Sequence, residues 1–259
     1  MKTRFLLLLS LFLFNVIHCS AQQDLKGKAY CLISDKTWPF CQIHFFPNGE
    51  YFIDISKKKT DDIVYSFILS FGQYEENNNC VSLKDEIMGY EIRMSSTNDT
   101  LDVIKAFSFM QGGRFAFCEK EYKANAPDID HTSLLKVKEE RQQYFHNNKK
   151  SFDLEYGIYV AESTIIDYKL HLLDNQTYQL QYLSYTISEG TWKKYGNELN
   201  LFDKNMEYTF YMLVGEKQLI SKLLPGDKAG NLILKLKQNN DLETVPNIKQ
   251  KWFGCSRRK

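Results

Sequence analysis

The residues best suited to acid–base or metal chemistry are few and scattered along the chain. Of five histidines, His44 and His171 stand out because each comes just before a turn sequence. Gln42 and Lys169 alternate with them, so we expect both imidazoles to point outward, where a lone histidine is a poor metal ligand. The sequence Asp128–His131 looks metal-binding, but capping of the helix that follows explains it better.

The carboxylates do not form a catalytic pair. Glu75-Glu76 and Glu139-Glu140 are adjacent in sequence, and neighbouring side chains on a strand or a helix diverge. The G-x-S-x-G pattern of a hydrolase and a glycine-rich phosphate loop are both absent. We therefore predict no catalytic residues, no cofactor and no metal, and a protein that is not an enzyme.

The cysteines are better suited to disulfide bonds than to zinc. Cys31, Cys41, Cys80 and Cys118 lie in the first half of the chain, and none of them forms a C-x2-C pair. Cys31 falls on the first expected strand and Cys118 on the last, and these strands become neighbours if the sheet closes. Our preferred pairing is Cys31–Cys118 with Cys41–Cys80 as its complement, although other pairings stay open. Cys255 is the odd cysteine.

The sequence segments that position these residues occur twice in the chain. Two runs of similar length share glycine, turn and aromatic positions in the same order, which indicates two copies of one small domain. The matched segments are Gly27–Tyr30 with Gly157–Tyr159, Phe45–Tyr51 with Leu172–Tyr178, Gly72–Tyr74 with Gly190–Trp192, Val81–Asp85 with Leu199–Asp203, and Phe115–Phe117 with Leu232–Leu234.

Each copy reads as short antiparallel strands. Side chains alternate along Ile63–Phe71 and Leu183–Ile187, and Asn48-Gly49 marks a tight turn. Closure of such a meander removes exposed strand edges. The expected fold is all-β, with two tandem small antiparallel meander barrels of about eight strands each, joined by a helical linker. A sandwich and one larger barrel made from both copies are the alternatives.

The domain boundaries follow from changes in pattern. We expect a signal peptide over 1–21, a first barrel over 22–122, a linker over 123–150, a second barrel over 151–240 and a basic tail over 241–259. Within the linker, helical spacing over 134–147 places Leu134, Val137, Arg141 and Tyr144 on one face, with Leu135 and Phe145 close to it. This helix either docks on one barrel or plugs a barrel mouth.

The N-terminus has the pattern of an export signal. Lys2 and Arg4 precede an apolar run over 5–17 that is too short to span a bilayer. Cys19 and Ala21 are the small residues that a signal peptidase requires, so we expect cleavage after Ala21 and a location in the periplasm or outside the cell. A lipoprotein anchored at Cys19 is the alternative. We expect no transmembrane span.

Charge and composition narrow the class of partner. The formal charge is +1, and aromatic residues make up 14% of the chain. Nucleic acids need a concentrated basic field, so we do not expect them as partners. The aromatic content favours strands.

The repeated motifs resemble a known family. The opening glycine–tyrosine strand, the turn over 172–178, Gly190–Trp192 and Leu199–Asp203 look like the small lipocalin-like barrels of exported Bacteroidetes proteins. They are also weakly similar to the N-terminal barrel of envelope copper-resistance lipoproteins. This resemblance implies a fold and no site residues.

Two functional hypotheses remain. The first is an exported, non-enzymatic module that binds a small apolar ligand, because small barrels hold such ligands when their interiors are open. The alternative is an envelope interaction or structural protein that acts through barrel surfaces or the linker helix. The oligomeric state is left open.

Overall fold

The computed structural model describes residues 24–33, 40–60, 63–118, 131–161, 167–227 and 232–237. The expected signal peptide, its cleavage after Ala21, the lipid anchor at Cys19 and the basic tail with Cys255 lie outside these residues. Within them, no helix has the length and apolarity needed to cross a membrane.

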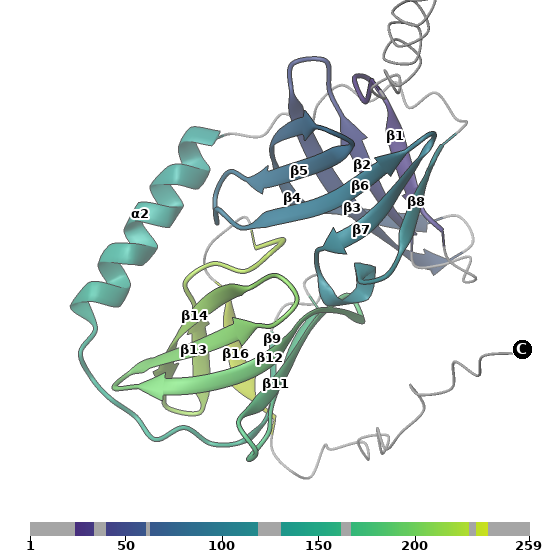
Figure 1. Cartoon of the computed structure of the whole chain (residues 1–259). Coiled ribbons are helices and arrows are strands. Elements are labelled where there is room, and N and C mark those ends of the chain that lie inside the picture. Colours follow the sequence, from purple (N-terminus) through teal and green to yellow (C-terminus); the bar gives the residue numbers. More distant parts are fainter. Residues whose placement is uncertain are drawn as a thin grey trace, which may run out of the picture.

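The first copy is a closed barrel in which each strand pairs antiparallel with the next and the last returns to the first (Figure 1). Its strands are β1 (Ala29–Leu32), β2 (Phe40–Phe45), β3 (Glu50–Thr60), β4 (Ile63–Asn77), β5 (Cys80–Asp85), β6 (Glu91–Thr97), β7 (Thr100–Lys105) and β8 (Arg114–Phe117), with a short 3₁₀ helix η1 (Ser108–Met110) before β8.

The second copy closes in the same way, with β16 returning to β9. Its strands are β9 (Gly157–Ala161), β10 (Tyr168–Leu172), β11 (Thr177–Tyr182), β12 (Tyr185–Tyr195), β13 (Glu198–Asp203), β14 (Tyr208–Gly215), β15 (Gln218–Ser221) and β16 (Ile233–Leu236). The prediction of two small barrels of eight strands each is therefore confirmed, and the single larger barrel is excluded.

The repeat extends to irregularities of the strands. A bulge interrupts the pairing of β3 with β4 after Ile53, and the equivalent bulge interrupts β11 with β12 after Leu180. At Gly72 and Gly190, an added Cβ would lie 2.1 and 2.0 Å from a backbone oxygen of the next strand. Only glycine allows this approach, which explains why both copies keep it.

One part of the sequence alignment between the copies was wrong. Phe117 pairs with Tyr30 in the first barrel, whereas Leu236 pairs with Tyr159 in the second. The equivalent of Phe117 is therefore Leu236 and not Leu234, a shift of two residues. A two-residue shift keeps every side chain on the same face, so the apolar pattern alone could not detect it.

Both barrel interiors are filled by their own side chains. The expected core residues Tyr30, Ile43, Tyr51 and Leu83 of the first barrel, and Tyr159, Leu170, Tyr178, Trp192 and Leu201 of the second, are all buried. Phe67 differs, because it is only partly buried and its ring lies 6.0 Å from that of Tyr182 in the other barrel.

The two barrels meet through equivalent residues. Tyr90 and Tyr208 occupy the same position in the two copies, and their rings contact edge to face with centres 5.7 Å apart. The Tyr208 hydroxyl donates a hydrogen bond of 2.9 Å to the Met88 carbonyl. The Phe67–Tyr182 contact lies in the same interface, and the two cores merge into one cluster.

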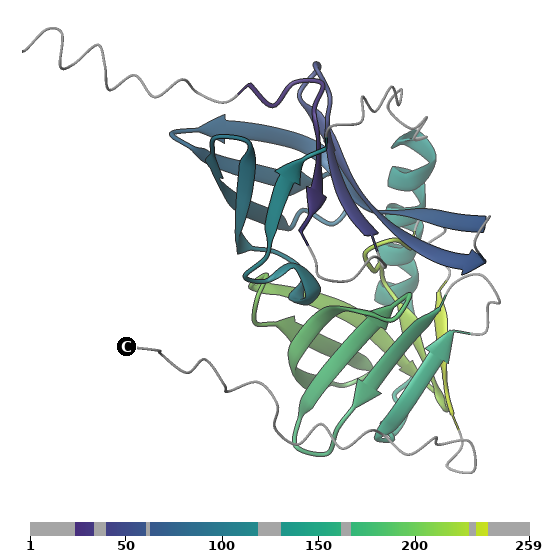
Figure 2. The same ribbon diagram turned by 90° about the vertical axis from the view of Figure 1, so that its right-hand side faces the viewer.

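The linker helix α2 (His131–Asn147) runs along the outside of both barrels (Figures 1 and 2). Leu134 and Val137 pack against a cluster of Phe52, Phe71, Ile87 and Leu223, and Phe145 is buried against Leu213 and Ile220 of the second barrel. The helix therefore docks on both barrels, and neither expected position, on one barrel or in a mouth, was right.

The helix face was also predicted only in part. Leu135 and Tyr144, which we placed on or close to the packed face, are 43% and 42% exposed. Residues 134, 137, 141 and 145 form one stripe at 3.6 residues per turn, and 135 and 144 flank it on opposite sides.

The second barrel should fold without the first. A fragment spanning 151–237 contains every strand of that barrel and no cysteine. We expect cooperative unfolding in urea that is unchanged by reductant, at lower stability than in the whole chain because Tyr182 and Tyr208 lose their contacts across the interface. Circular dichroism during denaturation measures this. An insoluble fragment, or one without a cooperative transition, would contradict an independent barrel.

Candidate functional site

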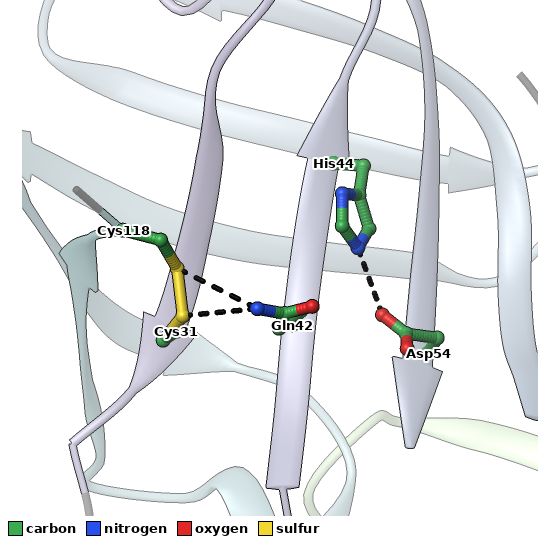
Figure 3. The surroundings of a disulfide bond; sticks show 5 residues. All are labelled: Cys31, Gln42, His44, Asp54 and Cys118. Carbon is green, nitrogen blue, oxygen red and sulfur yellow. Dashed lines mark hydrogen bonds and ion pairs between the residues drawn. A yellow bond between two sulfur atoms is a disulfide. The ribbon is translucent and has the colours of Figure 1, made fainter. Parts of the chain in front are cut away.

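His44 lies on the outer face of the first barrel but is not exposed. Its neighbours Ile43 and Phe45 point into the core, so the predicted direction of His44 is right. Its side chain is nevertheless buried, at 3% exposure. The ring stacks on Phe52 with centres 4.1 Å apart, and Nε2 lies 2.9 Å from Asp54 Oδ1 (Figure 3). The outer face is covered here, so the expectation of a solvent-exposed imidazole was wrong.

His171 occupies the equivalent place in the second barrel in a different environment. Gln181 replaces the carboxylate of Asp54 and donates to Gln179 instead. Burial, together with the charge of Lys169, lowers the pKa of His171. Among the described residues, Nε2 of His171 has no hydrogen-bond partner. A neutral imidazole fits this environment, since burial disfavours the charged form.

The structure forms the disulfide between Cys31 and Cys118, with Cα atoms 5.8 Å apart. It joins β1 to the end of β8, which is the seam where the barrel closes. Figure 3 shows the amide of Gln42 directed at the bond, and its Nε2 lies 3.2 Å from Cys31 Sγ and 3.8 Å from Cys118 Sγ. The disulfide therefore lies on the same outer face of the barrel as His44 and Asp54.

The expected second bridge, Cys41–Cys80, is not formed, because both residues are free thiols. Cys41 lies on β2 and points into the core, where burial raises the pKa of its thiol. Cys80 lies on β5 and is partly exposed, and β5 pairs with β4 and β6 only. The sequence pattern identified the strands but not which cysteines share a face.

No metal or acid–base cluster emerges from the other candidates. In the ranges that the structure describes, no three His, Cys, Asp or Glu side chains lie together as metal ligands would. Glu75 pairs with Ser82 and Glu76 with Val81, so their side chains diverge as expected. Glu139 and Glu140 are exposed on α2. Residues 128–130 lie outside the described ranges.

A buried polar network in the first barrel, repeated in part in the second, was not predicted. Tyr51 lies 2.9 Å from the Ser70 hydroxyl, which donates at 2.8 Å to Asp85 Oδ2. Because a hydroxyl carries one proton, Tyr51 is the donor to Ser70. Oδ1 of Asp85 accepts from the backbone N–H groups of Ile87 and Met88 at 3.1 and 2.7 Å. The network thus ties the barrel interior to the turn after β5.

The second barrel repeats this arrangement in part, because Oδ2 of Asp203, the equivalent of Asp85, has no hydrogen-bond partner among the described residues. Tyr178 pairs with Ser188 at 2.6 Å, and Asp203 Oδ1 accepts from the backbone N–H groups of Asn205 and Met206 at 2.7 and 2.8 Å. The two turns held by these carboxylates carry Tyr90 and Tyr208, so the networks position the interface between the barrels.

A hollow opens between the second barrel, the turn after β5 and helix α2. Its volume is about 150 Å³, or about 500 Å³ when the adjoining space open to solvent is included. Its walls are mostly apolar and aromatic, with two lysines and a glutamine, and are formed by Ile87, Met88, Lys138, Gln142, Tyr208, Thr209, Phe210, Tyr211, Lys222 and Leu223. No sequence pattern indicates this hollow, because it exists only where three separate elements pack together.

Comparisons with known proteins do not assign the chain to a family. No family model and no curated protein matches it. One similar solved structure is the DNA polymerase sliding clamp from Bacillus subtilis, at 11% identity and a TM-score of 0.16, covering 90% of this chain and 62% of that one. The chain spans less than two thirds of the clamp's length, and a likeness this weak supports no conclusion about fold or function.

Removal of the Asp85 carboxylate should destabilise the protein. Asp85→Ala leaves two backbone N–H groups and the Ser70 hydroxyl without their acceptor, which costs about 1–3 kcal/mol at a buried site. Asp102→Ala is the control, because Asp102 forms an exposed ion pair with Arg114 and such pairs contribute about 0–1 kcal/mol. Urea denaturation of both variants measures the difference. Equal losses would show that the network does not support the fold.

The same carboxylate should make stability depend on pH. Burial raises the pKa of Asp85, and its hydrogen bonds offset this only in part. The Asp85 carboxyl therefore binds a proton more tightly in the folded state than in the unfolded state. The contribution of Asp85 to the free energy of unfolding falls as pH rises from about 4 through the folded pKa. Asp85→Asn does not titrate, so it should gain stability relative to the natural protein over this range. Urea denaturation at several pH values measures this, and an Asp85→Asn variant that loses stability relative to the natural protein as pH rises would contradict the prediction.

Proposed function

We propose that this is an exported, non-enzymatic binding protein whose site is the hollow beside helix α2 and not a barrel interior. The observation that carries this proposal is the hollow itself, with its mostly apolar walls. Its volume of about 150 Å³ is smaller than the usual small-molecule site of about 300–1,000 Å³, so a ligand would be held there in part and would extend along the side that is open to solvent. The barrel interiors, which our sequence analysis favoured as ligand sites, are occupied by buried side chains such as Tyr30, Phe115 and Phe210.

The composition of the walls supports binding rather than catalysis. Ile87, Met88 and Leu223 supply apolar surface, and Tyr208 already uses its hydroxyl on the Met88 carbonyl. None of the histidines or paired carboxylates that we weighed as catalysts lies among the lining residues. Apolar surface with a few polar groups is the usual composition of a site that holds a small molecule.

Export is supported by the N-terminal pattern and by the disulfide. A bond between Cys31 and Cys118 persists in an oxidising compartment and is rare in the cytosol. The relationship to lipocalin-like barrels of exported proteins remains a prediction from the sequence motifs.

A neutral apolar probe should bind in the hollow. N-phenylnaphthylamine, whose fluorescence rises in apolar surroundings, should bind saturably to the purified protein. Thr209 lines the hollow on the outer face of β14, so Thr209→Trp should fill it and weaken binding by about tenfold or more, equal to about 1.4 kcal/mol.

The chain offers a matched control for this substitution. Thr191 is exposed on the same outer face, and both threonines pair with Phe202 from opposite sides, but Thr191 does not line the hollow. Thr191→Trp should leave binding unchanged. Equal effects of the two substitutions, or the lack of saturable binding to the natural protein, would contradict the proposed site.

A further inference from the structure

Two lysines line the hollow from different elements. Lys138 lies on α2 and Lys222 follows β15, and both side chains are partly buried. Lys222 Nζ lies 5.2 Å from the centre of the Tyr211 ring and 5.9 Å from that of Phe145. These rings hold the ammonium group beside the apolar wall.

Neither ammonium group has an acidic partner among the described residues. Other lysines do, since Lys136 pairs with Glu140 on α2 and Lys204 pairs with Glu189 at 2.9 Å. The residues that line the hollow include no aspartate or glutamate. Partly buried positive charges in a low-dielectric wall create a site that favours an anion.

The nearest buried carboxylates do not neutralise this charge directly. Asp85 and Asp227 line a second, adjoining hollow that shares Ile87, Met88 and Leu223 with the first. Asp85 accepts from Ser70 and two backbone N–H groups, and Asp227 accepts from Ser221 at 3.0 Å. Both are thus engaged with donors of their own barrels.

We propose that the ligand of this hollow is an amphipathic anion, such as a small organic acid with an apolar body. Its body would lie on Ile87, Met88 and Leu223, and its anionic group would pair with Lys138 and Lys222. Charge-assisted hydrogen bonds to a carboxylate or sulfonate are about twice as strong as neutral ones, so the lysines would set the preference for charge. This inference rests on the proposed function, because it names the ligand class of the same site.

A pair of probes that differ in charge tests the inference. Anilinonaphthalene sulfonate and N-phenylnaphthylamine share one aromatic skeleton, and only the first carries an anionic group. The natural protein should bind the anionic probe about tenfold more tightly, which corresponds to about 1.4 kcal/mol. Lys138→Met and Lys222→Met should each remove most of this preference while binding of the neutral probe stays unchanged.

Lys136→Met is the matched control, because Lys136 lies on the same helix, is 76% exposed and does not line the hollow. It should bind both probes as the natural protein does. Decanoate should displace the anionic probe from the natural protein more effectively than decanol does. Thermal unfolding of each variant verifies that it is folded, and Thr209→Trp should weaken binding of both probes.

The outcomes separate this inference from the proposed function. If both probes bind in the hollow equally well, or if Lys136→Met acts like Lys222→Met, the anionic ligand is wrong and the binding site stands. If neither probe binds saturably, or Thr209→Trp has no effect on either, the proposed function itself fails.

Discussion

A small antiparallel barrel of eight strands encloses little more than the volume of its own inward side chains. In both barrels that space is taken by tyrosine, phenylalanine and aliphatic residues at or near zero exposure. Such filling stabilises each barrel from within, so the ligand site that we propose lies outside the barrels. The proposed site depends on the surfaces between the barrels and the helix.

The surfaces between the barrels and the helix depend on two carboxylates, Asp85 and Asp203, at equivalent positions of the two copies. Asp85 and Asp203 each hold the turn that follows a central strand, and these turns carry Tyr90 and Tyr208 to the interface. The same turn of the first barrel supplies Ile87 and Met88 to the hollow. One buried network thus fixes a barrel end, the contact between the barrels and a wall of the candidate site. The carboxylate at the same position of the other copy holds the turn before Tyr208, whose hydroxyl reaches back to the Met88 carbonyl.

The sequence carried enough information to predict the barrels, because alternation, tight turns and the duplication all record contacts within one copy. It also placed Cys31 and Cys118 at a closing seam. It could not predict the burial of His44, since the residues that cover the outer face, such as Phe52, are neighbours only in the folded sheet. The hollow could not be predicted either, because its walls come together only in the folded protein. Its lysines, Lys138 and Lys222, lie on elements whose relative position depends on packing between copies.

Differences between the copies show where the linker helix acts. In the first barrel, Phe52 and Phe71 form the apolar outer patch beside Leu134 and Val137, and the paired residues at the equivalent places in the second barrel are Gln179 and Glu189. In the second barrel, Leu213 and Ile220 cover Phe145, whereas the equivalent residues of the first barrel are the paired Ser95 and Asp102. At these equivalent places, the outer face is apolar in the barrel where the helix packs and polar in the other. The positions common to both copies build the barrels and the contact between them, and the positions that diverge build the surfaces on which the helix packs.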